Sequence, residues 1–96
     1  MSDVITTAVT ALQAKLADGF SAGSAKFVIP GEGAIIADAS GVREGDEDTD
    51  VTLTAEAEVF RAILDGEMNP TMAFMSGKLT VDGNMGLAMQ LGAALS

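Results

Sequence analysis

Apolar residues near the start of the chain recur every three or four positions, which is the period of an α-helix. Ile5, Leu12 and Leu16 belong to one apolar stripe. The stripe predicts a helix over residues 3–17. Several β-branched residues weaken this helix, so it depends on docking its stripe onto another element. Gly19 follows at a place where a glycine commonly ends a helix.

Alternating apolar and polar positions predict five strands further along the chain. These strands cover residues 25–29, 34–39, 42–44, 50–54 and 78–82. Helical spacing returns in residues 55–64, in a short segment that begins at Asn69-Pro70, and in residues 85–95. Asn69 and Asn84 suit the N-cap position of the last two helices, and Pro70 suits the first helical position.

The order of these elements is a helix, three meandering strands, one more strand, two helices, a strand and a helix. This order predicts an α/β (α+β) fold with a single mixed five-stranded sheet, covered mainly on one face by helices. A chain of 96 residues without a repeat or a linker supports one domain, which spans residues 1–96.

Charge limits the partners that the chain can have. The formal net charge is −9, from 14 acidic and 5 basic residues. Five scattered cations cannot neutralise a phosphate backbone, so we expect no nucleic-acid binding. The same charge opposes stable membrane anchoring, and no apolar run of about 18 residues is present to span a bilayer. The N-terminus lacks a signal-peptide pattern, so we expect a cytoplasmic protein.

The chain contains no His, Cys, Tyr or Trp. This excludes Ser-His-Asp and Cys-His nucleophile systems, and zinc sites built from His or Cys. Asp46, Asp48 and Asp50 follow the first three ligand positions of a calcium loop. The pattern then fails, because Val51 and Ala57 stand where that loop needs Gly and Glu. We therefore expect a solvated acidic loop, no metal, no cofactor and no enzymatic activity.

The last third of the chain is rich in methionine and poor in charge. Five of the six methionines lie between Met68 and Met89. Such a cluster suits either a cavity for ligands of varied shape or the filling of gaps in a core. Residues 83–96 contain no charged side chain, whereas a surface helix normally has a polar face. The last helix is therefore predicted to be a buried terminal helix, a lid over an apolar cavity or a dimer surface.

Three spaced motifs follow one another within residues 65–91. They are Gly66-Glu67-Met68-Asn69-Pro70, Ala73-Phe74-Met75-Ser76-Gly77-Lys78-Leu79 and Gly83-Asn84-Met85-Gly86-Leu87-Ala88-Met89-Gln90-Leu91. This segment resembles the signature region of the sterol carrier protein type 2 family. The strand and helix before it also fit, and the first half of the chain fits more weakly. The resemblance identifies residues 1–96 as a single sterol-carrier-type lipid-binding domain.

The resemblance implies a hydrophobic tunnel between the sheet and the helices. Members of the family bind sterols, fatty acids, fatty acyl-CoA esters or phospholipids, and some move them between membranes. We therefore expect non-catalytic binding of an apolar lipid. By motif match and apolar character, the expected ligand-binding residues are Phe60, Leu64, Met68, Met72, Phe74, Met75, Leu79, Met85, Leu87, Met89 and Leu91.

The chain also departs from the animal members of the family. Some of these carry amides where Thr71 and Ser76 stand, so their headgroup contacts do not transfer. We interpret Lys78 as a surface lysine rather than as a headgroup partner. The chain does not end in the peroxisomal tripeptide of animal members, so we expect a bacterial cytoplasmic protein whose lipid need not be a sterol. The alternative function is a protein-interaction or dimerisation module that uses the last helix, and we expect a monomer or a weak dimer.

Overall fold

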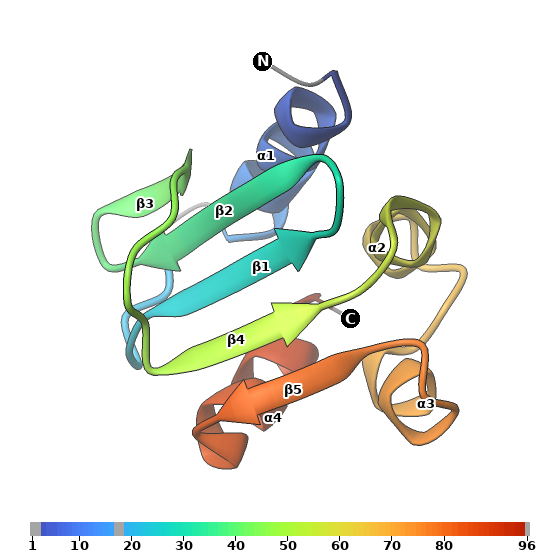
Figure 1. Ribbon diagram of the computed structural model, residues 1–96. Coiled ribbons are helices and arrows are strands. Elements are labelled where there is room, and N and C mark those ends of the chain that lie inside the picture. Colours follow the sequence, from blue (N-terminus) through green and yellow to red (C-terminus); the bar gives the residue numbers. More distant parts are fainter. Residues whose placement is uncertain (1–2, 17–18, 96) are drawn as a thin grey trace.

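The computed structural model describes residues 3–16 and 19–95 (Figure 1). The helices and strands found within these residues follow one another as α1 (Asp3–Lys15), β1 (Ala25–Ile29), β2 (Gly33–Asp38), β3 (Gly41–Glu44), β4 (Val51–Thr54), α2 (Ala57–Leu64), α3 (Pro70–Met75), β5 (Thr80–Gly83) and α4 (Met85–Leu95). The order of elements predicted from the sequence is confirmed. The part of the predicted first helix that falls on residue 17 lies outside the described residues.

The strands form one mixed sheet in the order β3-β2-β1-β4-β5. β1 and β4 pair in parallel, and the other neighbouring strands pair antiparallel. The parallel pair joins the N-terminal three-stranded meander to the β4–β5 half of the sheet. This register places Phe27 opposite Leu53, and Leu53 opposite Val81. One row of apolar side chains therefore crosses three adjacent strands.

Several boundaries differ from the predicted ones by one or two residues, and two of these differences have a clear local reason. α2 begins at Ala57 because the N–H of Ala55 is still bonded to the carbonyl of Val28 on β1, at 3.2 Å. β5 begins at Thr80 because the N–H groups of Lys78 and Leu79 both bond to the carbonyl of Ala73, at 2.9 and 3.1 Å. These last two bonds close the C-terminal end of α3 before the strand starts.

Helices cover one face of the sheet, as predicted. Figure 1 shows α1 behind the β2 side of the sheet and α4 behind β4 and β5, while α2 and α3 lie at one end. The side chains of Phe27 and Ile29 on β1, Ile5 on α1 and Leu91 on α4 are almost fully buried in the layer between them. Among the described helices, none is both long and apolar enough to cross a bilayer.

The other face of the sheet is closed partly by the acidic loop. Asp46 pairs with Lys26 of β1 at 2.8 Å, and Glu47 pairs with Arg43 of β3 at 3.2 Å. Arg43 also donates two hydrogen bonds to the carboxylate of Asp38, and these bonds lower the pKa of Asp38 below its ordinary value of 3.8. The loop that was expected to be simply solvated is therefore tied to the sheet by ion pairs.

Candidate functional site

A cavity of about 450 Å³ lies between the inner face of the sheet and helices α2, α3 and α4. We call it the main cavity. Its lining consists of Phe27, Leu53, Phe60, Ile63, Pro70, Thr71, Phe74, Met75, Leu79, Val81, Met85, Ala88, Met89, Leu91, Gly92, Ala93 and Leu95. Among these residues none is charged, and Thr71 has the only polar side chain.

Local periodicity explains how the lining comes together. Phe27, Leu53 and Val81 stand at paired positions on β1, β4 and β5, so the pleat points all three to the helical side. Phe60 and Ile63 are one helical turn apart on α2, and the ring of Phe60 packs edge-on against Phe27 with centroids 5.7 Å apart. Strands and helix thus contribute one continuous apolar wall.

The short helix α3 and the last helix α4 are set beside this wall by two side-chain caps. The Asn69 side chain accepts hydrogen bonds from the N–H groups of Thr71 and Met72, at 2.8 and 3.4 Å. The Asn84 side chain accepts a hydrogen bond from the N–H of Leu87 at 3.1 Å. Both asparagines therefore fill the N-cap role expected from the sequence, and they fix where each helix begins.

The structure brings together seven of the eleven residues expected to bind the ligand. These seven line the main cavity, and they are Phe60, Phe74, Met75, Leu79, Met85, Met89 and Leu91. Phe60, Leu79 and Leu91 are buried in its wall, whereas Met75 and Met89 are 80% and 76% exposed. The exposed members form the mouth of the cavity, where they offer apolar surface to the solvent.

The other four expected residues do not line the main cavity. Leu64 lines the space toward α1, because around α2 it lies on the opposite side of Phe60 from Ile63. Met68 is half-buried beside a separate, more open hollow that Lys78 also lines. Met72 points outward and is 68% exposed. Leu87 is buried beside Gly23, away from the cavity.

Sequence reasoning missed the contribution of the strands to the lining. The residues not expected there are Phe27, Leu53, Ile63, Pro70, Thr71, Val81, Ala88, Gly92, Ala93 and Leu95. The family motifs lie within the last third of the chain, whereas Phe27 and Leu53 lie before it. Both residues lie in predicted strands, but only the parallel pairing of β1 with β4 sets them side by side.

The exposure of the methionines and of α4 answers two questions that the sequence left open, namely whether the methionines fill gaps in the core and whether the last helix is wholly buried. Met72, Met75, Met85 and Met89 are exposed, so gap filling in the core does not explain them. α4 is buried along Leu87, Leu91 and Leu95 and exposed on its Met85 and Met89 side. It is therefore a half-covered helix that walls the cavity rather than a wholly buried one.

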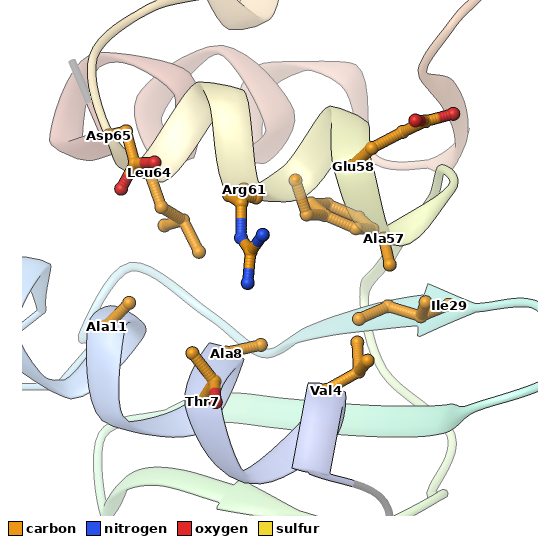
Figure 2. A pocket seen from close by; sticks show the side chains of 11 residues that line it. Val4, Thr7, Ala8, Ala11, Ile29, Ala57, Glu58, Arg61, Leu64 and Asp65 are labelled. Carbon is orange, nitrogen blue, oxygen red and sulfur yellow. The ribbon is translucent and has the colours of Figure 1, made fainter.

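A second, smaller cavity of about 280 Å³ lies between α1 and α2, and we call it the α1–α2 pocket (Figure 2). It is lined by Val4, Thr7, Ala8, Ala11, Ile29, Ala57, Glu58, Phe60, Arg61, Leu64 and Asp65. Phe60 lines both cavities. Figure 2 shows the Arg61 side chain pointing from α2 into the space above Ala8 and Thr7 of α1.

The chain can now be compared with known proteins. Residues 7–96 match the model of the SCP-2 sterol transfer family. The chain belongs to this family. The resemblance found in residues 65–91 is thereby confirmed and extends over almost the whole chain. The human sterol carrier protein 2 is 38% identical over 80 residues, which are 80% of this chain and 14% of that protein.

A second relative shows the same disparity of length. The zebrafish (Danio rerio) hydroxysteroid dehydrogenase-like protein 2 is 52% identical over 42 residues, which are 44% of this chain and 10% of that protein. The chain thus spans about a tenth to a seventh of the curated relatives it matches. The match therefore does not assign the activity of those longer proteins to this chain.

Three solved structures of similar fold are insect proteins. The sterol carrier protein 2 like 2 of Aedes aegypti has a TM-score of 0.78 at 24% identity, over 94% of both chains. The sterol carrier protein domain 2 of Helicoverpa armigera has a TM-score of 0.71 at 28% identity, over 96% of this chain and 84% of that one. The sterol carrier protein 2 of Aedes aegypti, solved with palmitate, has a TM-score of 0.76 at 22% identity. The match covers 100% of this chain and 97% of that one.

Proposed function

We propose that this chain binds one lipid molecule, such as a long-chain fatty acid, with the hydrocarbon part in the main cavity and with no reaction performed on it. The observation that carries the proposal is the lining of that cavity. Three strands and three helices contribute apolar side chains to it, and an exposed methionine mouth leads to the solvent. General acid–base chemistry needs titratable groups at the reacting atoms, and the described lining offers none.

The energy available from such a cavity is sufficient for useful affinity. Each methylene group removed from water contributes about 0.8 kcal/mol, so a sixteen-carbon chain offers about 12 kcal/mol gross. Ordering the ligand and immobilising it cost several kcal/mol. The remainder, about 8 kcal/mol, corresponds to a dissociation constant of about 1 μM. Two Aedes aegypti proteins of this fold were solved with palmitate, which supports a fatty acid as the first ligand to test.

A binding titration with a fluorescent sixteen-carbon fatty acid tests the proposal. We expect saturable binding by the unmodified protein and at least tenfold weaker binding by Ala88→Phe, because the new ring occupies the cavity. Ala94→Phe is the matched control, since Ala94 is exposed on the same helix and outside the lining. Thermal unfolding verifies that both variants fold. Absence of saturable binding to the unmodified protein, or full affinity in a folded Ala88→Phe, would contradict the proposal.

Association with another protein through α4 is the second candidate function. It is favoured by the exposure of Met85 and Met89, which makes an apolar surface on that helix. Because this surface is also the mouth of the main cavity, a second copy seated there would block lipid entry. The mass in solution, measured with and without fatty acid, separates the two functions. A stable dimer whose mass and stability do not respond to fatty acid favours association.

A further inference from the structure

We infer that the α1–α2 pocket receives the carboxylate of the bound lipid, with Arg61 as its partner, while the hydrocarbon tail lies in the main cavity. This inference rests on the proposed function and adds to it the place where the carboxylate of a long-chain fatty acid binds. It also assigns a role to Arg61, a residue that stands outside the family motifs in this sequence.

The two cavities are direct neighbours along the same elements. Phe27 lines the main cavity and Ile29 lines the α1–α2 pocket, and these residues are two apart on the inward face of β1. On α2, Phe60 lines both cavities. A ligand that extends from one cavity to the other therefore passes beside the buried ring of Phe60.

Arg61 is the cation that stands at the end of this path. Its guanidinium points into the α1–α2 pocket, over the small side chain of Ala8 (Figure 2). Glu58 and Asp65 lie three and four positions away on the same helix, where ion pairs with Arg61 are common. Among the described residues, no carboxylate is paired with Arg61. Figure 2 shows Glu58 directed away from the pocket and Asp65 at its far end.

Other cations are less suited to this role. Lys26 is paired with Asp46, and Arg43 is paired with Asp38 and Glu47. Lys78 is exposed, as Arg61 is, but the hollow beside it shares no lining residue with the main cavity, whereas the α1–α2 pocket shares Phe60. Arg61 therefore combines an apolar wall with a guanidinium that is turned into the space.

The chemistry of the guanidinium selects an oxyanion. Its five N–H donors form a rigid fork that binds a carboxylate or a phosphate through two parallel hydrogen bonds. Val4, Ala11 and Leu64 give the pocket an apolar lining, against which the methylene groups next to the carboxylate can pack. Glu58 and Asp65 at the rim, together with the net charge of −9, repel a doubly charged phosphate more than a singly charged carboxylate. The geometry thus favours the carboxylate.

The test compares three sixteen-carbon probes that differ only in the end group: the fatty acid, the fatty alcohol and the monoalkyl phosphate. Their dissociation constants are measured for the unmodified protein, for Arg61→Gln and for Lys78→Gln, which removes the same charge elsewhere. We expect Arg61→Gln to weaken acid binding about tenfold and to leave alcohol binding unchanged. Lys78→Gln leaves both unchanged. Added salt weakens acid binding in the unmodified protein and has less effect in Arg61→Gln.

Each other outcome has a defined meaning. Equal loss of acid and alcohol binding in Arg61→Gln overturns the inference, because Arg61 then acts only through packing. Loss in Lys78→Gln but not in Arg61→Gln also overturns it and moves the end group to the other hollow. Tighter Arg61-dependent binding of the alkyl phosphate overturns the choice of a carboxylate. In all three cases the proposed function survives, whereas failure of every probe to bind the unmodified protein removes both.

Discussion

Gly83 shows what a single residue contributes to the wall of the main cavity. It ends β5 opposite Val51, with a φ of +105°. A Cβ atom built on Gly83 would lie 2.5 Å from the carbonyl oxygen of Asp50, which is closer than real Cβ contacts. The backbones of β4 and β5 therefore approach each other here because no side chain intervenes. Two residues before Gly83, Val81 completes the row that lines the cavity.

Gly83→Ala is expected to lower the free energy of unfolding by about 3 kcal/mol, since backbone strain and a steric clash add. Gly31→Ala is the matched control, because Gly31 also has a positive φ, +81°, but no atom lies within 4 Å of its Cβ position. There the expected loss is about 1 kcal/mol, from the φ angle alone. Urea denaturation measures both values. Equal losses of unfolding free energy in the two variants would show that the close approach of β4 and β5 does not contribute to the cost of Gly83→Ala.

At the scale of elements, α4 has to wall a cavity and still let a ligand pass. Its Leu87, Leu91 and Leu95 side chains anchor it to the core, while the Met85 and Met89 side remains open. Gly92 lies in the cavity lining and weakens the helix, because glycine lowers helix stability by about 1 kcal/mol relative to alanine. We interpret this weakness as the means by which the helix moves when the ligand enters.

Gly92→Ala is expected to raise the free energy of unfolding by about 0.8 kcal/mol. Its Cβ position has only ordinary van der Waals contact, 3.7 Å from the side chain of Pro70. Gly86→Ala is the comparison and should gain less, because its Cβ would crowd the Asn84 cap oxygen at 3.2 Å. Stopped-flow release of a fluorescent fatty acid should also be slower in Gly92→Ala. A faster release, or a loss of stability, would count against a role of α4 movement in exchange.

At the scale of the whole molecule, charge and apolar surface are segregated. The chain carries a net charge of −9, yet α3 and α4 contain no charged residue. The mouth of the main cavity, between these two helices, is therefore an uncharged apolar area on an acidic protein. The net negative charge repels the protein from an anionic membrane surface. At a neutral membrane, contact through the mouth does not require any charged side chain to lose its water.

We therefore expect the protein to take up a fluorescent fatty acid faster from neutral phosphatidylcholine vesicles than from vesicles that contain anionic lipid. Because the effect is electrostatic, salt should narrow the difference between the two vesicle types. Uptake rates measured at low and at physiological ionic strength test this. Rates that are equal for both vesicle types, or faster from anionic ones, would contradict a role of the net charge.

Local signals in the sequence determined the elements of this protein. The period of apolar residues predicted each helix and strand, and Asn69 and Asn84 marked two helix starts, because both kinds of signal act between residues a few positions apart. The motifs of residues 65–91 indicated the family, and most of the expected cavity residues on α3 and α4 came from them.

Only the tertiary structure decided what those elements form together. The parallel pairing of β1 with β4 sets Phe27 beside Leu53, although 25 residues separate them in the chain. Packing against the sheet determines which side of the uncharged helix α4 is buried, so that Leu87 points inward and Met89 outward. The docking of α1 against α2 made the pocket that Arg61 enters. Periodicity defines the faces of an element, but which partner each face meets depends on contacts between distant residues.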